Sequence, residues 1–121
     1  MKNNTYDIFT GDELKVAELI QQRRYQLLIH SCIYYALNQN AISDMQWDSW
    51  AKELKTLQEH YPNISEKIML FEYFKDWDAS TGAFLPITED WVLQKAHQIL
   101  KRIGKIKKES KPKITKKRSL F

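Results

Sequence analysis

The sequence predicts an all-α fold of about four helices, with an N-terminal helical hairpin and a disordered basic C-terminal tail. Chain breakers are scarce, because 121 residues contain only three glycines and three prolines. Charge divides the chain: residues 1–100 carry nine Lys/Arg and fourteen Asp/Glu (net −5), whereas residues 101–121 carry ten Lys/Arg and one Glu (net +9). We expect one helical domain over 1–104 and a disordered tail, poor in apolar residues, over 105–121.

The first predicted helix covers about residues 11–37. Thr10 followed by Glu13 has the pattern of a capping box, in which the two side chains bind main-chain N–H groups at the helix start. Its apolar residues make a stripe wide enough to be buried from about Leu27 onward. The polar run 38–40 should end this helix, which we expect to be the longest in the fold.

A second helix is predicted to start at Ser43 or Asp44, where Ser43 and Gln46 again form a capping-box pattern. Its apolar face recurs at three- and four-residue steps, formed by Trp47, Trp50, Ala51, Leu54, Leu57 and Tyr61. Pro62 should stop it. With a connector this short, the two helices should pair as a hairpin.

The second half of the chain predicts shorter elements. Residues 65–74 are dense in apolar side chains, which favours a short buried helix, although a strand remains open because short apolar runs are ambiguous. Residues 76–86 are expected to be a loop, and Thr88 to be the N-cap of a last helix. The inward side chains predicted for that helix are Trp91, Val92, Ala96, Ile99, Leu100 and Ile103.

Several classes of protein are disfavoured. The single cysteine, Cys32, excludes an intramolecular disulfide and lies in an apolar run typical of a buried thiol. His30, His60 and His97 are far apart, with no metal-ligand pattern around them, so each is expected to be hydrogen-bonded or exposed. No signal peptide or membrane span is evident, so we expect a cytoplasmic protein.

Five residues around the predicted hairpin turn have the chemistry of a ligand site: Tyr34, Tyr35, Asp44, Trp47 and Asp48. Aromatic faces stack on a cationic ring, and carboxylates one helical turn apart point to one side and can accept hydrogen bonds from ribose hydroxyls. Simpler roles exist for each residue. Tyr34 and Tyr35 can be core residues, Asp44 can stabilise a helix start, and Trp47 lies on the apolar face.

The spacing of these residues resembles the small N-terminal helical (Ia) domain of NAD-dependent DNA ligases over about residues 14–64. The matching positions are Tyr34, Tyr35, Asp44, Trp47, Asp48, Glu53, Leu54, Leu57, Tyr61 and Pro62. The resemblance implies a site for nicotinamide mononucleotide or NAD formed by the first five. Two features depart from the family pattern: Trp47 replaces an aromatic residue that carries a hydroxyl, and the connector over 38–43 lacks prolines.

The resemblance does not imply ligase activity. A chain of this length cannot contain the several domains that ligation requires. The closest string to the family's Lys-x-Asp-Gly nucleophile motif is Lys75-Asp76-Trp77-Asp78, which has the wrong spacing and no glycine. The chain therefore looks like the small, often phage-encoded proteins named for their likeness to this ligase domain. We expect a non-catalytic module of DNA metabolism.

The C-terminal tail suggests an alternative role in binding DNA or the replication sliding clamp. Its candidate contact residues are Lys105, Lys107, Lys108, Lys111, Lys113, Lys116, Lys117, Arg118, Leu120 and Phe121. Lysine-rich segments bind nucleic-acid phosphates in a salt-dependent way, although such a tail can also serve solubility alone. The terminal Ser-Leu-Phe resembles the end of bacterial clamp-binding peptides, but Lys117 and Arg118 stand where those peptides have Gln and Leu.

Overall fold

The structure is a computed structural model that describes residues 8–104 of the chain. Its elements are α1 (Gly11–Ser31), the π-helical segment η2 (Cys32–Ala36), α2 (Asp44–His60), α3 (Pro62–Ser65), α4 (Phe71–Phe74) and α5 (Asp90–Arg102). No strand occurs in this part of the chain, so the all-α prediction is confirmed. The predicted tail, 105–121, lies outside the described residues.

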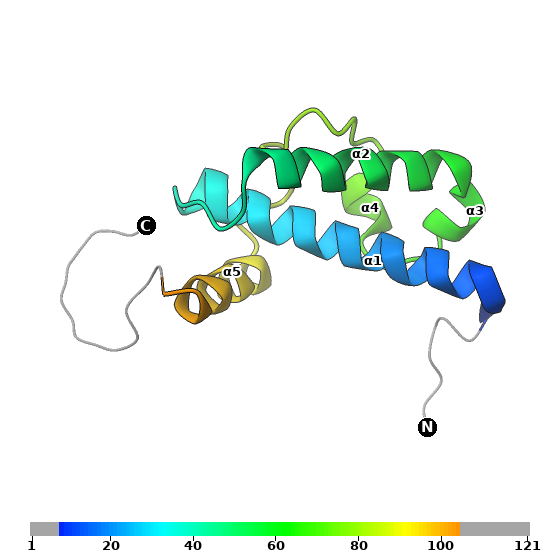
Figure 1. The fold of residues 1–121 in the computed structure, drawn as a ribbon, viewed down its shortest axis with the longest axis horizontal. Helices are drawn as coiled ribbons and strands as arrows, with labels where there is room; N and C mark the ends of the chain where they lie inside the picture. The colour runs from blue at the N-terminus through cyan, green and yellow to red at the C-terminus, as the bar shows by residue number, and fades with distance from the viewer. Residues whose placement is uncertain (1–7, 105–121) are drawn as a thin grey trace, which may run out of the picture.

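The predicted hairpin is present. Helices α1 and α2 lie side by side and run in opposite directions, and α5 packs against the C-terminal end of α1 and against η2 (Figure 1). The fully buried side chains at the centre of these contacts come from α1, η2, α2, α4 and α5: Ile20, Leu27, Leu28, Ile33, Leu54, Phe74, Val92 and Leu100. Burial of such side chains is the main stabilising term in a fold of this size.

The first helix changes type where the candidate tyrosines lie. An α-helix was predicted to continue to residue 37, but Cys32–Ala36 is π-helical, and the N–H of Leu37 donates to the carbonyl of Cys32 at 3.1 Å. Asn38 then adopts a left-handed conformation (φ +57°), which asparagine tolerates better than most residues. This wider turn offsets Tyr34 and Tyr35 from the register of an α-helix, and π-turns are frequent at functional sites.

The two predicted capping boxes differ in the structure. Ser43 is the N-cap of α2, and its hydroxyl accepts a hydrogen bond from the N–H of Gln46 at 3.0 Å, as predicted. Thr10 is the N-cap of α1, but its side chain makes no capping bond, so that part of the prediction is wrong. Gly11, the first residue of α1, has φ +51°, a left-handed conformation that changes how the chain enters the helix.

This difference gives a matched pair of stability tests. Ser43→Ala should lower the free energy of unfolding by about 1 kcal/mol, because the N–H of Gln46 loses its acceptor. Thr10→Ala should change it by no more than a few tenths of a kcal/mol, since no side-chain cap is lost. Urea denaturation of both variants and the parent measures the difference. A loss of only a few tenths of a kcal/mol for Ser43→Ala as well would show that the Ser43 cap does not contribute.

The continuous helix predicted over 65–74 is wrong. The segment instead contains turns between α3 and α4, and Leu70 has a left-handed conformation (φ +71°) that interrupts any helix. The interruption lies against the buried Arg24 of α1, whose guanidinium donates hydrogen bonds to the carbonyls of Ile68 and Met69, both at 3.0 Å. These carbonyls are turned toward α1 rather than along a helix axis.

Two details of the last helix also differ from the prediction. Glu89, not Thr88, is the N-cap of α5, because residues 87 and 88 form a turn before the helix. Val92, Ala96 and Leu100 are buried as predicted, whereas Ile103, beyond the last turn of α5, is 48% exposed.

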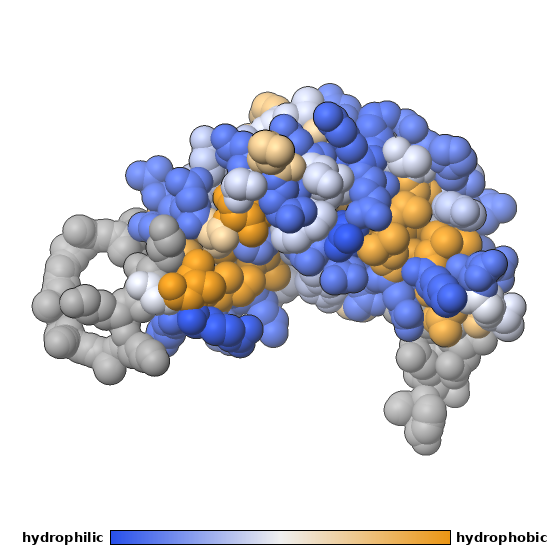
Figure 2. All heavy atoms as spheres, in the orientation of Figure 1, coloured by the Kyte–Doolittle hydropathy of each residue, from blue (hydrophilic) through white to orange (hydrophobic). Residues whose placement is uncertain are grey.

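Figure 2 shows hydrophobic residues at the surface in two places, over α5 and where α1 passes α3. No described helix has the length and apolar character to cross a membrane.

Candidate nucleotide site

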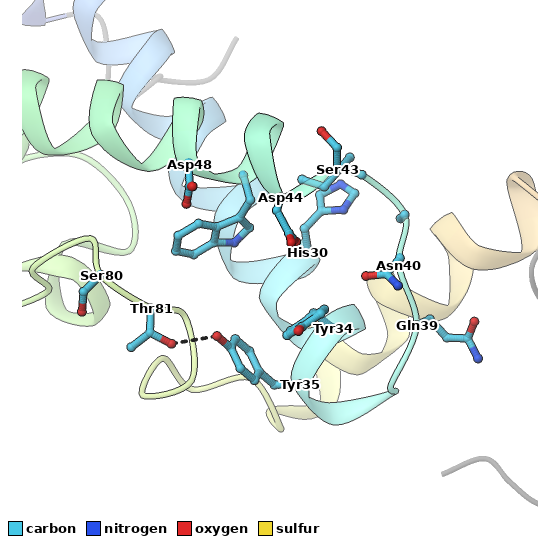
Figure 3. A pocket seen from close by; sticks show the side chains of 13 residues that line it. His30, Tyr34, Tyr35, Gln39, Asn40, Ser43, Asp44, Asp48, Ser80 and Thr81 are labelled. Atoms are coloured by element: carbon cyan, nitrogen blue, oxygen red, sulfur yellow. Dashed lines mark hydrogen bonds between the residues drawn. The ribbon is translucent and has the colours of Figure 1, made fainter.

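A pocket of about 280 Å³ opens where the first helix ends and α2 begins. Three segments line it: the end of α1 with η2, the connector with the first turns of α2, and a loop between α4 and α5 (Figure 3). The lining residues include all five predicted from the sequence, Tyr34, Tyr35, Asp44, Trp47 and Asp48. The hairpin therefore brings these five side chains together, while their role in binding remains a prediction.

Tyr34 and Tyr35 are half-exposed rather than core residues, at 50% and 45% exposure. Their rings meet edge to face, with centroids 4.8 Å apart and planes at 90°. The hydroxyl of Tyr35 lies 2.8 Å from the Oγ1 of Thr81, and either oxygen can donate. Two large aromatic faces at perpendicular angles thus border a pocket, where a core role would have buried them.

Asp44 and Asp48 are exposed, one turn apart on α2, and border the same hollow as the tyrosines (Figure 3). Asp44 also lies in the first turn of α2, where a negative charge suits the helix dipole. Within residues 8–104 neither carboxylate forms an ion pair. The described lining residues include no lysine or arginine, so the pocket has a negative character.

Trp47 forms a wall of the pocket rather than a hydrogen-bonding group within it. Its indole Nε1–H donates to the Oγ of Ser31 at 3.1 Å, and its ring contacts Trp77 edge to face with centroids 6.2 Å apart. The side chain is partly buried against the core. Trp47 therefore both packs against the core and lines the pocket. Its indole N–H already donates to Ser31.

His30 is a lining residue that sequence reasoning missed. It lies one helical turn before Tyr34, and its ring packs on Trp50 at 5.6 Å. The prediction that each histidine is hydrogen-bonded or exposed holds for His60 and His97, but it is wrong for His30, whose buried Nδ1 has no hydrogen-bond partner among the described residues. Burial lowers the pKa of His30, so the neutral ring is favoured.

Ser80 and Thr81 were also missed, because nothing in their local sequence points to a site more than thirty residues away.

Nucleophilic catalysis by a thiol and metal binding are both disfavoured near the pocket. Cys32 is fully buried, and burial raises the pKa of its thiol to about 11, so it is not a nucleophile at neutral pH. Among residues 8–104 no group of His, Cys, Asp and Glu side chains is arranged to hold a metal ion.

Comparison with known proteins agrees with this geometry. Residues 13–67 match the protein family described as "DNA ligase-like, N-terminal NAD+-binding domain". This segment is therefore similar to the N-terminal NAD+-binding domain of DNA ligases. The predicted resemblance over 14–64 is thus confirmed, and eleven of the thirteen pocket-lining residues lie within the matched segment.

A DNA ligase from Bacteroides fragilis is 37% identical to this chain over 54 residues. The aligned region is 45% of this chain but only 8% of the ligase. The similarity is therefore limited to a small part of that enzyme. No solved structure gave a significant match to the chain. The lining residues Ser80 and Thr81 lie outside the segment that matches the family.

Proposed function

We propose that the pocket binds nicotinamide mononucleotide, either free or as part of NAD. The supporting observation is that two half-exposed tyrosines and two carboxylates, neither in an ion pair with another residue of 8–104, border one hollow inside a segment that matches an NAD+-binding family. Its volume of about 280 Å³ is near the lower end of ordinary ligand pockets, which suits half of a dinucleotide better than the whole.

The nicotinamide ring is the part of the ligand that suits the tyrosines. In the oxidised nucleotide it is a pyridinium cation, and a cation over an aromatic face gains about 0.5–2 kcal/mol. Tyr34 and Tyr35 present faces at 90° to each other, so the ring can stack on one and meet the edge or hydroxyl of the other. The carboxylates add a favourable electrostatic term for the same positive charge.

The ribose is the part that suits Asp44 and Asp48. Vicinal hydroxyls donate well to carboxylates, and hydrogen bonds to a charged acceptor are worth about 1.5–3 kcal/mol. Both carboxylates line the pocket and are free of ion pairs within the described chain. The phosphate has no lysine or arginine among the described lining residues, so we place it toward solvent.

In this proposal the chain captures the nucleotide without joining DNA itself. The supporting observations are the absence of a Lys-x-Asp-Gly motif from the sequence and a family match confined to the NAD+-binding part of the ligase. We propose an accessory module in cytoplasmic DNA metabolism, of the kind that phage genomes encode.

Isothermal titration calorimetry of the full chain tests the ligand assignment. Nicotinamide mononucleotide should bind more tightly than adenosine monophosphate, because adenine is neutral at pH 7 and gains no cation–π energy. Nicotinamide riboside, which keeps the cation but lacks the phosphate, should bind at least as tightly as the mononucleotide. Absence of heat with every nicotinamide ligand at millimolar concentration would refute the proposal.

A second role is proposed for the basic segment 101–121, supported by its net charge of +9. Lys105, Lys107, Lys108, Lys111, Lys113, Lys116, Lys117, Arg118, Leu120 and Phe121 lie outside the described residues. Removing 105–121 should leave nucleotide binding intact and abolish association with DNA or the clamp. Leu120→Ala with Phe121→Ala should weaken clamp binding only, whereas DNA binding should fall with salt in the parent and in this double variant alike.

A further inference from the structure

The third wall of the pocket comes from Ser80 and Thr81, which lie in a loop over residues 78–83 beyond the segment that matches the ligase family. Thr81 is its central residue. The Thr81 Oγ1 lies 2.8 Å from the Tyr35 hydroxyl and also accepts a hydrogen bond from the N–H of Ala83 at 3.1 Å. The carbonyl of Thr81 accepts a third from the indole of Trp77 at 2.8 Å. Thr81 is thus held on both its main chain and its side chain.

Gly82 places this loop directly against the helical hairpin. A β-carbon at Gly82 would lie 1.9 Å from the Oγ of Ser31 and 3.2 Å from a ring carbon of Trp47. Only glycine allows that approach, because real β-carbons do not come so close to other atoms. The Ser31 Oγ also accepts the hydrogen bond from the Trp47 indole. Gly82 of the loop, Ser31 of α1 and Trp47 of α2 are therefore packed together.

Asp78 stiffens the start of the loop. Its Oδ1 accepts hydrogen bonds from the N–H and the Oγ of Ser80, at 2.9 and 2.7 Å. Ser80 and Thr81 both line the pocket, and Figure 3 shows Thr81 across from Tyr35. The loop is therefore fixed at Asp78, at Trp77 and at Gly82, and its one side-chain hydrogen bond across to η2 is the bond to Tyr35.

We propose that Thr81 is a positioning residue that holds the Tyr35 ring in its ligand-binding orientation, so that this loop completes the nicotinamide pocket within the chain. Tyr35 is otherwise half-exposed, and its ring contact among the described residues is the edge of Tyr34. Without the bond to Thr81, the ring would rotate more freely about χ1 and χ2, and ordering it would reduce ligand affinity. The consequence for affinity rests on the proposed function, whereas the hold on Tyr35 does not.

The test compares Thr81→Val, which keeps the shape but removes the hydroxyl, with Thr81→Ser, which keeps the hydroxyl. The first readout needs no ligand: NMR spectra of the full chain with ¹³C-labelled tyrosine rings. Thr81→Val should move the Tyr35 ring signals toward those of a freely exposed tyrosine, and Thr81→Ser should leave them near the parent positions. Unchanged Tyr35 signals in Thr81→Val would overturn the proposal, whatever the ligand does.

The second readout is the affinity for nicotinamide mononucleotide. Thr81→Val should weaken binding roughly three- to tenfold, as expected for one neutral hydrogen bond, and Thr81→Ser should bind like the parent. Tyr35→Phe should weaken it through loss of the bond to Thr81, and the double variant should be no worse than Thr81→Val, which removes that bond together with the acceptor of the Ala83 N–H. Parental affinity in Thr81→Val would also overturn the proposal. If the parent itself binds no nicotinamide ligand, the proposed function fails and the ring signals alone decide the role of Thr81.

Discussion

Arg24→Ala should cost about 3–5 kcal/mol of the free energy of unfolding, a large part of the 5–15 kcal/mol typical of a small domain. Arg24 is fully buried, and its guanidinium donates at least five hydrogen bonds to described residues. The acceptors are the side chain of Gln58, the carbonyls of Ile68 and Met69, and the carbonyl and hydroxyl of Ser65. Alanine would leave these acceptors, those of Ile68 and Ser65 in buried bonds, without their donor and would open a cavity.

Arg24→Lys should recover only a small part of that loss, because one ammonium group cannot reproduce the planar five-donor geometry. Arg23→Ala is the matched control, since the adjacent arginine bonds to the partly exposed Glu53 at 2.6 Å. That change should cost about 0.5–1 kcal/mol, the usual value of a partly solvated pair. Chemical denaturation measures all three variants. A loss for Arg24→Ala no larger than that for Arg23→Ala would contradict the role given to the buried guanidinium.

Asp48→Asn and Tyr34→Ala should have the largest effects on nucleotide binding. Losing a charged hydrogen-bond acceptor for the ribose should weaken binding by at least tenfold. Losing the Tyr34 ring removes a stacking face and should reduce binding below detection by calorimetry. Both side chains are exposed at the pocket, so neither change should alter the free energy of unfolding by more than about 1 kcal/mol.

Two control variants match these changes elsewhere on the surface. Asp12 is an exposed aspartate in the first turn of α1, and Asp12→Asn should bind nucleotide like the parent. Tyr61 is 42% exposed, close to the value for Tyr34, but does not line the pocket. Tyr61→Ala should therefore keep the parental affinity. If the control variants lose affinity as the pocket variants do, the effect is general rather than local to the site.

The hairpin was predictable because it depends on local rules, and the five pocket residues were predictable because their spacing resembles the ligase domain. Helical spacing, the Ser43 cap and a short connector fix which ends of the first two helices meet, and these ends carry Tyr34, Tyr35, Asp44 and Asp48. The π-turn at Cys32–Ala36 was missed because its sequence reads as an ordinary apolar helix end. That turn sets how the tyrosine rings are presented.

The missed features depend on contacts between distant residues. The apolar run over 65–74 has a helical composition, but Arg24 binds its carbonyls from more than forty positions away. Thr81 likewise meets Tyr35 across 46 residues of sequence, through a loop whose path depends on Gly82 packing on Ser31. No periodic pattern encodes such contacts, so the third wall of the pocket emerged only from the structure.

The most direct measurement of the central claim is an NMR titration of the ¹⁵N-labelled full chain with nicotinamide mononucleotide. The account predicts chemical-shift changes grouped at residues 30–48 and at Ser80 and Thr81, with α5 and the remote end of α1 little affected. Adenosine monophosphate at the same concentration should produce smaller changes in that group. Shifts centred away from the pocket, or none with the nicotinamide ligand, would contradict the assignment of this site.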